Sequence, residues 1–496
     1  MLPAAIEKSE PMLRKALGPS EDIICQELRL RAGGRKVLLV FVEGMIDRDS
    51  LQEHAIAPLA TTDLPEGLPP TLEELGFRLI SVVVRKVVTD PAQVREKVCR
   101  GNVALLIDGY PGALVLGLQD WEERAIQSSP SESGLRGPRD AFVENVVTNI
   151  NLIRRRLNDP HLIVKYYRVG VRSRTLVAVL HIADIARDRL VTEIQDRVAA
   201  IEFDGVLDSA QMRELITGMP WAPKMEMTER PDKIVAGLLS GKVAVVTDNS
   251  PFTLTAPTTL MDTLWAADDY YSSPAITILT RFIRLVGVGV TLFLSPLYVG
   301  ITMFNPGLLR SDLAFYMARE RAGIPLVPTL ETIFLEIMME VLHEATIRLP
   351  SKIGSAATVV GGLIIGQAAV QARLLSGIVV IVAAISAIGS FTLPSQEMGQ
   401  AWRVTKWALI LAASTFGVYG IFVTSFMLFS WLASQDSFGT PYLAPVAPLI
   451  PGDLARDSLL RKPWGLVRRR AQSLRPKDPD RTSRSQDLKY RDGGER

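Results

Sequence analysis

Four long apolar runs between residues 281 and 433 limit what this chain can fold into more than any other feature. A helix needs about 20 mostly apolar residues to cross a hydrocarbon layer roughly 30 Å thick. The runs over 282–304, 357–375 and 407–433 reach that length, whereas the run over 378–393 is shorter. Because a helix satisfies its own backbone hydrogen bonds, it is the usual structure that crosses lipid. The sequence therefore predicts an α-helical polytopic membrane domain over residues 281–433.

The part of the 496-residue chain before this domain is mixed in composition and charged. Within residues 1–127, compact apolar runs that end at turn residues predict strands at 35–43, 79–88, 103–108 and 113–118. Residues 138–275 alternate helix and strand: helices are predicted at 140–157 and 187–201, and strands at 175–181 and 242–247. The segment 128–137, rich in Ser, Gly and Pro, is typical of a linker. The expected fold class is two small cytosolic α/β domains in series, followed by the helical membrane domain.

Three features predict that both ends of the chain lie in the cytosol. The first residues lack the apolar core of a signal peptide. Arg281 and Arg284 lie at the N-terminal end of the first apolar run, and basic residues are enriched on the cytosolic side of membrane helices. Residues 434–496 are rich in Arg and Lys, and no aromatics lie among the basic residues from 468 to 484, which predicts a largely disordered tail that contacts anionic lipid rather than nucleic acid. With both ends in the cytosol, the number of membrane crossings is even. There are four crossings if residues 325–349 do not cross the membrane fully. If they do cross it, one of the other segments must be re-entrant.

The segment 325–349 is neither a clean span nor an ordinary loop. Glu336, Glu340 and Glu344 are four residues apart and therefore share one helical face, opposite an apolar one. One interpretation is a helix at the membrane surface with its carboxylates in water. The other is a helix that lines a water-filled pathway, where carboxylates from several subunits form the rings that favour cations in pores. The periodicity leaves both interpretations open.

The second apolar run carries two further kinds of candidate residue. Gly362 and Gly366 have the GxxxG spacing that lets helices approach closely in lipid, and are candidates for helix packing. Gln367 is a strongly polar side chain in the middle of the run, and joins the three glutamates as a candidate pore or gate residue. Residues 395–406 are predicted to be the loop that leads to the last span.

No catalytic motif is evident in the sequence. Residues 237–243 lack the spacing of a phosphate-binding loop, His343 and Glu344 do not continue into HExxH, and no GxSxG is present. The two cysteines, Cys25 and Cys99, are far apart and outside any metal-binding or redox spacing. We therefore expect no enzyme, no cofactor and no metal site, and a reducing compartment for the soluble part.

Several motifs, in order along nearly the whole chain, are similar to those of one family. They are RGPRDAFVEN at 136–145, TNINLIRRRL at 148–157, ERPD at 229–232, DNSPF at 248–252, RFIRL at 281–285, RLP at 348–350, GLIIGQAAV at 362–370 and SFGTPYLAP at 437–445. The chain resembles the A subunits of GerA-type spore germination receptors, in the GerA/SpoVAF family. It departs from the pattern at Asn249, where Gly is usual, and at His343 and Thr346, where Arg and Gly are expected.

The resemblance implies a subunit of a nutrient-responsive receptor in the inner membrane of the spore. Its partners would be a permease-like B subunit that binds the germinant and a lipoprotein C subunit. Copies of the A subunit would assemble into a ring that opens as a channel for monovalent cations, which adds weight to the three glutamates as pore or gate residues. The resemblance also implies a domain interface that contains Arg136, Arg139, Asp140, Glu144 and Asn149.

Two other functions stay open beside the channel subunit. One is an accessory SpoVAF-like protein that amplifies germination, and the other is a non-conducting scaffold of the receptor cluster. A transporter is disfavoured, because such proteins are built from internal repeats and no internal duplication is expected here.

Overall fold

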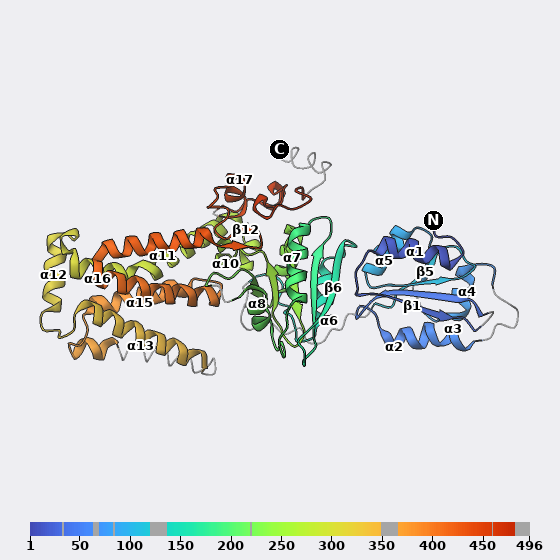
Figure 1. The fold of residues 1–496 in the computed structure, drawn as a ribbon, viewed down its shortest axis with the longest axis horizontal. Coiled ribbons are helices and arrows are strands. Elements are labelled where there is room, and N and C mark those ends of the chain that lie inside the picture. Colours follow the sequence, from blue (N-terminus) through green and yellow to red (C-terminus); the bar gives the residue numbers. More distant parts are fainter. Residues whose placement is uncertain are drawn as a thin grey trace. The chain divides into compact units, whose positions relative to one another are not determined.

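The computed structural model describes residues 1–31, 34–62, 69–82, 85–119, 136–218, 221–348, 366–458 and 460–481, and Figure 1 shows its ribbon. The chain forms two compact units. The sheet unit contains residues 1–258, 437–440 and the chain from 464 onward. The helical unit contains residues 259–436 and 441–463.

The first sheet of the sheet unit has the strand order β1-β2-β4-β5-β3, with every neighbouring pair antiparallel. Its strands are β1 (Ile23–Arg29), β2 (Lys36–Val42), β3 (Arg85–Val88), β4 (Val103–Ile107) and β5 (Ala113–Leu116). Successive residues of a strand point to opposite faces, so both faces of this apolar sheet need cover. On one face Leu39 packs with α2 (Arg48–Leu51), a π-helical turn (Gln52–Ile56), α3 (Ala57–Thr61) and α4 (Leu72–Leu79). On the other, Leu38 packs with α1 (Ile6–Leu17) and α5 (Pro91–Cys99). Figure 1 shows these two helices on one side of the sheet.

The second sheet has the order β6-β7-β9-β10-β8 and is again antiparallel throughout. Its strands are β6 (Leu162–Val169), β7 (Thr175–Ile182), β8 (Glu226–Thr228), β9 (Val243–Thr247) and β10 (Thr253–Ala256). Val179 of β7 faces α7 (Asp188–Ala199) and α8 (Ser209–Thr217). Its neighbour Leu180 faces α6 (Val146–Arg156) and α9 (Pro231–Ser240). Two small α/β sheet regions in series therefore make up this unit.

The two sheets form an internal repeat, contrary to the expectation of no duplication. Their strand orders are the same when each is counted from its own first strand. The sequences GNVALLIDGYP at 101–111 and GKVAVVTDNSP at 241–251 occupy equivalent places. In each, an aspartate after the strand accepts the backbone N–H that begins the first helix of the region: Asp108 from Ile6 and Asp248 from Val146, both at 3.1 Å. Asn249 follows with a positive φ of 65°, which Asn tolerates, so the departure from Gly leaves this turn intact.

The helical unit begins with α10 (Leu260–Leu264) and a 3-10 turn (Ala267–Tyr270). Next come α11 (Pro274–Phe304), a 3-10 turn (Pro306–Leu308), α12 (Ser311–Arg321) and α13 (Pro328–Arg348). Helical residues from 366 lead to α15 (Gly377–Phe391) and α16 (Gln396–Ser434), and α17 (Pro451–Asp453) and a π-helical turn (Leu454–Ser458) follow. Among the described residues, α11 and residues 397–434 of α16 are long and apolar enough to cross a membrane, and α15 is a shorter apolar helix.

The long helix α16 is not the single span predicted over 407–433, because it bends sharply at Gly417. This residue has φ 63° and ψ −145°, which are not helical values. A Cβ on Gly420 would collide with the carbonyl oxygen of Ala412, although residues eight apart are separated by about 12 Å along a straight helix. The bend divides α16 into residues 396–416, here called the first half, and residues 418–434, the second half. Most of the predicted loop 395–406 belongs to the first half.

Small residues bring α11 and α15 into close contact. A Cβ on Gly389 would lie 2.8 Å from the carbonyl oxygen of Gly287 and 2.7 Å from Thr291 Oγ1, so a larger side chain cannot enter this seam. Close approach at small residues is the usual way in which helices pack in lipid. Of the predicted packing pair, Gly362 lies outside the described residues. A Cβ on Gly366 would make ordinary contact with Val380, at 3.5 Å.

The C-terminal tail differs from the expected disorder up to residue 481. It begins with a two-stranded ribbon, β11 (Asp436–Ser437) and β12 (Thr440–Pro441), and two 3-10 turns (Trp464–Leu466 and Gln472–Leu474) follow. In the sheet unit, buried Arg470 donates a hydrogen bond to the carbonyl oxygen of Leu239 at 2.8 Å. Lys477 lies 2.6 Å from a carboxylate oxygen of Asp188. These contacts fix the tail on the second sheet region.

Candidate functional site in the helical unit

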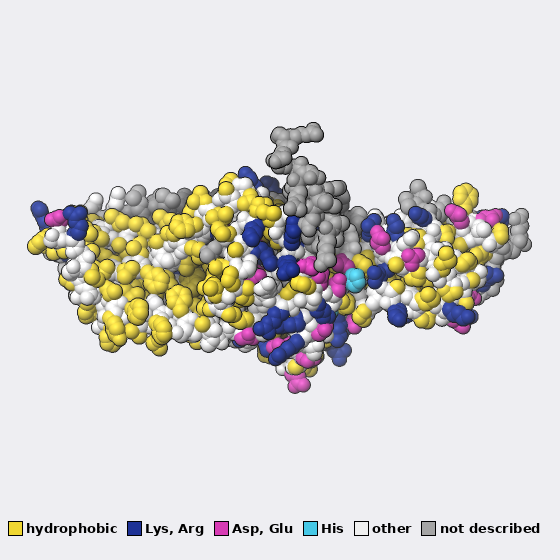
Figure 2. Space-filling model, turned by 90° about the horizontal axis from the view of Figure 1, so that it is seen from above, with side chains coloured by type: hydrophobic (Ala, Val, Ile, Leu, Met, Phe, Trp, Pro, Cys, Tyr) yellow, Lys and Arg dark blue, Asp and Glu magenta, His cyan; other side chains and the backbone are white. Residues whose placement is uncertain are grey.

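The helical unit holds charged side chains inside and apolar ones outside. Glu336 of α13 is 5% exposed and Lys406 of α16 is 4% exposed, whereas Ile337 and Val341 of α13 are 45% and 58% exposed. Figure 2 shows hydrophobic side chains over most of the visible face of this unit, in the left part of the view. Water-soluble proteins bury charge rarely, and an arrangement of this kind suits a lipid surround. Glu336 is thus buried away from water, whereas the surface-helix interpretation of 325–349 required its carboxylate to lie in water.

Glu336 is held by two other helices. Its Oε2 lies 2.5 Å from Lys406 Nζ, and its Oε1 accepts a hydrogen bond from Ser295 Oγ of α11 at 2.7 Å. Lys406 Nζ also donates to Ser386 Oγ of α15 at 3.4 Å. Both charges are almost fully removed from solvent, so each depends on these partners to offset the loss of its hydration. Four helices therefore meet at a single buried ion pair.

Similar pairs flank Glu336 on α13. Glu340 Oε2 lies 3.2 Å from Arg403 Nε, one turn before Lys406 on α16. Fully buried Glu331 lies 3.2 Å from Arg321 of α12 and accepts the backbone N–H of Ser376 at 2.9 Å. Glu344, by contrast, is exposed and pairs with Arg348 of its own helix at 2.8 Å. Exposure of the α13 carboxylates thus increases from Glu331 and Glu336 through Glu340 to Glu344.

Hydroxyl groups extend this polar interior along α11. Thr291 Oγ1 donates to the carbonyl oxygen of Ser386 at 3.2 Å, and Ser386 Oγ donates to the carbonyl oxygen of Thr291 at 3.3 Å. Further along α11, the hydroxyls of Tyr298 and Ser376 are 3.3 Å apart. Polar contacts across helices are a common adhesive in lipid, where an unpaired polar group is costly. Together with the ion pairs, they form the polar lining of an otherwise apolar bundle.

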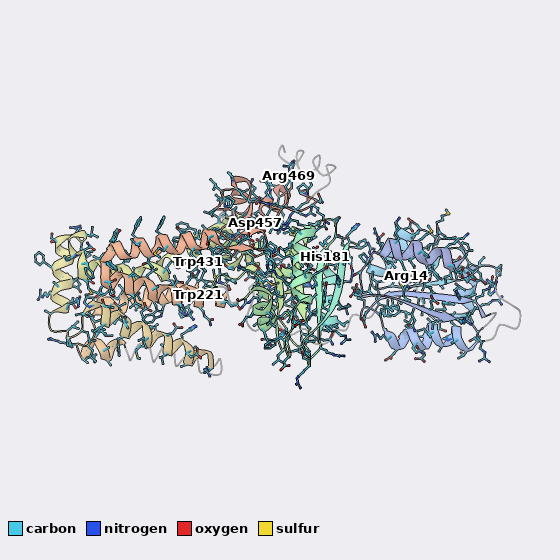
Figure 3. The ribbon with its side chains drawn as sticks, viewed as in Figure 1. Arg14, His181, Trp221, Trp431, Asp457 and Arg469 are labelled. Carbon is cyan, nitrogen blue, oxygen red and sulfur yellow. The ribbon has the colours of Figure 1, made fainter. Side chains whose placement is uncertain are left out.

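A second charged cluster fixes the start of α11. Arg281 is fully buried, lies 3.1 Å from Asp457, which Figure 3 labels, and stacks over the Trp265 ring. Arg284 donates to both carboxylate oxygens of Asp269, at 2.6 and 2.9 Å. Burial also raises the pKa of the neighbouring Tyr270 well above its ordinary value, so this phenol stays neutral. The basic residues that predicted the cytosolic end of the first span therefore have a structural task as well.

The remaining predicted pore residue, Gln367, is exposed, so the structure does not bring it into the buried site. Sequence reasoning missed Lys406 and Arg403, because both lie in the segment predicted to be a loop. It also missed Ser295 and Ser386, which are ordinary members of apolar runs. In the described residues, no group of three or more His, Cys, Asp and Glu side chains is placed to hold a metal ion.

The predicted domain-interface residues are not gathered into one contact. Arg136, Arg139 and Glu144 are exposed, and Asp140 pairs with Arg156. Asn149 is buried and bonds to the backbone of Val143 through both its amide oxygen and its amide nitrogen, at 2.8 and 2.6 Å.

Arg154 makes a buried contact between the two sheet regions. Its guanidinium forms an ion pair with Asp22, before β1, and donates to Ser20 Oγ at 3.0 Å. All three residues are buried.

The described residues thus form a protein of two parts: a pair of repeated α/β sheet regions, and a helical unit with an apolar exterior and buried ion pairs. The family model described as "Bacillus/Clostridium GerA spore germination protein" matches residues 11–473. The chain belongs to this GerA family.

Relatives cover most of the chain. Spore germination protein KA of Bacillus subtilis is 30% identical over 98% of this chain and 90% of its own length. Spore germination protein A1 of the same organism is 34% identical over 86% of this chain and 87% of its own. Spore germination protein GerLA of Bacillus cereus is 32% identical over 94% and 95%. Among solved structures, the N-terminal domain of the A subunit of the Bacillus megaterium germinant receptor GerK3 is 23% identical, covers 52% of this chain and 96% of its own, and has a TM-score of 0.41.

Proposed function

We propose that this chain is the membrane A subunit of a nutrient-responsive spore germination receptor, and that its copies assemble into a germinant-gated cation channel. Membership of the GerA family supports the germination role, since relatives matching nearly the whole chain are named spore germination proteins. The apolar exterior of the helical unit supports a place in the inner membrane of the spore. The observation that carries the channel is the row of α13 carboxylates that runs from the buried interior to the exposed Glu344.

The proposed membrane topology has six crossings instead of four. Thr329 Oγ1 lies 2.8 Å from Met303 Sδ, and Glu336 bonds to Ser295, so α13 runs antiparallel to α11 through the bundle. We count α11, α13, α15 and both halves of α16 as crossings, with local bilayer thinning to accommodate the short α15. The apolar segment 357–375 supplies the sixth, and both ends of the chain then lie in the cytosol.

In this proposal the exposed polar residues face the axis of a ring of subunits. Rotation about a symmetry axis would repeat Glu344 and Gln367 in every copy, and rings of carboxylates favour cations. Glu340 lies at the edge of the same face, whereas Glu336 is neutralised within its own subunit. A permease-like B subunit would bind the nutrient and a lipoprotein C subunit would complete the receptor. The exposed Arg136, Arg139 and Glu144 would serve subunit contacts in the cytosol.

The test is germinant-triggered potassium release from spores that carry Glu344→Gln. The matched control is Glu320→Gln, which neutralises an exposed carboxylate on α12. Co-purification of the B and C subunits checks assembly in every strain. We expect slower or less selective cation release with Glu344→Gln and normal release with the control. Normal release from spores that lack this chain would contradict the proposal. If spores that lack this chain release no potassium, but Glu344→Gln spores release it normally, the non-conducting scaffold is favoured.

A further inference from the structure

The deepest part of the polar interior has the ligands of a cation site. Glu336 offers two carboxylate oxygens, and Ser295 and Ser386 offer hydroxyl oxygens. Both serines are fully buried and come from two different helices. Carboxylate and hydroxyl oxygens are the groups that hard cations accept in place of water. The position between Glu336 and Ser386 is filled by the ammonium of Lys406, itself a compact point charge.

We propose that Glu336, Ser295 and Ser386 form a site for a monovalent cation, which the Lys406 ammonium occupies in the resting receptor. On activation Lys406 withdraws, and a potassium or sodium ion takes its place beside Glu336. The lysine acts as a tethered cation that keeps the site closed to ions. This inference rests on the proposed channel function, and adds to it a binding site and the residue that controls access to it.

A purely structural role is a poor account of this ion pair. Removing two charges from water costs several kcal/mol per ion, and their attraction rarely exceeds that cost by much. Close packing, as in the glycine seam between α11 and α15, joins helices in lipid without that cost. Charged residues in the interior of membrane domains are, for this reason, concentrated along the paths of ions.

The arrangement of α16 allows the lysine to withdraw. Arg403 and Lys406 lie one turn apart on its first half and pair with Glu340 and Glu336, one turn apart on α13. A shift of this half therefore breaks both pairs together. The Gly417 bend separates it from the second half, so it can move without carrying the rest of α16. The glycine seam between α11 and α15 keeps Ser295 and Ser386 in place during that movement.

The first experiment measures thermal unfolding of the purified full-length protein in potassium chloride and in N-methyl-D-glucamine chloride, whose cation is too large for the site. Lys406→Met removes the ammonium and keeps the length of the side chain, while Lys406→Arg retains a cation as the matched control. We expect potassium to raise the unfolding midpoint of Lys406→Met by about 5 °C. The wild type, Lys406→Arg and the double variant Glu336→Gln/Lys406→Met should show no such shift. Lys406→Gln, whose amide can still bond to Glu336, repeats the test if the methionine variant is unstable.

The second experiment records ion release from spores as the germinant concentration is varied. Lys406→Met should lower the half-maximal concentration about tenfold, because the resting state has lost its tethered cation. Lys462→Met, which removes an exposed ammonium outside the site, should respond like the wild type. Potassium sensitivity no greater than in the wild type, or sensitivity that survives loss of Glu336, would overturn the cation site. Spores without this chain test the channel separately. If they release ions normally, the proposed function fails. If they release no ions, but Lys406→Met spores respond like the wild type, only the inference of the cation site fails.

Discussion

The interiors of the two units are built from opposite kinds of residue. In the sheet unit, successive apolar residues such as Leu38 and Leu39 of β2 fill both faces of each sheet and are almost fully buried. In the helical unit, the centre holds Glu336 and Lys406 together with hydroxyl groups. Burial of apolar surface drives folding in water, but lipid gives helices no such drive toward one another. The sheet unit is thus held by many non-directional apolar contacts. The helical unit depends more on a few directional polar contacts, whose partners can change.

The largest effect is expected where the helical unit relies on close packing. Gly287→Leu would force a branched side chain into the α11–α15 seam, and we expect about a tenfold loss of protein from the membrane. Gly289→Leu is the matched control, because a Cβ on Gly289 meets no other atom within 4 Å. Immunoblots of spore membranes measure both variants. Equal abundance of the two would show that this seam does not hold the unit together.

A smaller but still large effect is expected at the buried ion pair between the two sheet regions. Arg154→Met leaves Asp22 buried and unpaired, which costs about 3–5 kcal/mol of unfolding free energy. Arg155→Met, at the exposed neighbouring position, should cost about 0.5 kcal/mol or less. Hydrogen-exchange mass spectrometry of β6 in the full-length protein measures the difference. If Arg154→Met lowers the unfolding free energy no more than Arg155→Met does, the Arg154–Asp22 ion pair does not help to join the two sheet regions.

The next effect concerns protons in the sheet unit. Burial, and then nearby Lys477, lower the pKa of His181 to about 4. The unfolded chain takes up a proton below pH 6.5 while the folded chain does not, so this stability is complete above pH 6.5 and falls toward pH 4. The loss should reach about 3 kcal/mol and should disappear in His181→Asn. Hydrogen exchange of β7 between pH 4 and 7 measures it, with exposed His161→Gln as control. A pH profile unchanged by His181→Asn would contradict the assignment.

The smallest effect on stability is expected at the exposed end of α13. Glu344 pairs with Arg348 on its own helix, so Glu344→Gln should cost about 0.5 kcal/mol or less. Glu336→Gln, eight residues earlier, leaves Lys406 buried and unpaired and should lower the abundance of the protein several-fold. Immunoblots and thermal unfolding compare the two. Similar losses from both variants would mean that the gradient of exposure along α13 has no energetic meaning.

Much of the fold could be predicted because apolar patterning is local. The runs that predicted strands at 35–43 and 103–108 correspond to β2 and β4, and the first apolar run lies within α11. The repeat of 101–111 at 241–251 is visible as identical residues at the positions of Gly101, Val103, Ala104, Asp108 and Pro111, and the expectation of no duplication missed it. The bend at Gly417 was not visible to hydropathy, since it depends on a backbone angle within an uncharged run.

The site could be predicted only in part. Periodicity placed Glu336, Glu340 and Glu344 on one face of a helix, but it does not say whether that face meets water or other helices. Whether this face meets water or other helices depends on Arg403 and Lys406, which are more than sixty residues away in the sequence and lie on another helix. The same limit applies to Arg154, whose partner Asp22 lies in the other sheet region. Pairings over such separations are set by the tertiary fold, and a single sequence carries no local sign of them.

The most direct test of the central claim is rubidium flux into lipid vesicles that contain the purified receptor of A, B and C subunits. We expect flux that begins when the germinant is added, that requires this chain, and that falls when Glu344 is replaced by Gln. Vesicles with B and C subunits alone should be silent. Germinant-dependent flux of equal size without this chain would contradict the account, as would a complete receptor that binds the germinant and passes no cation.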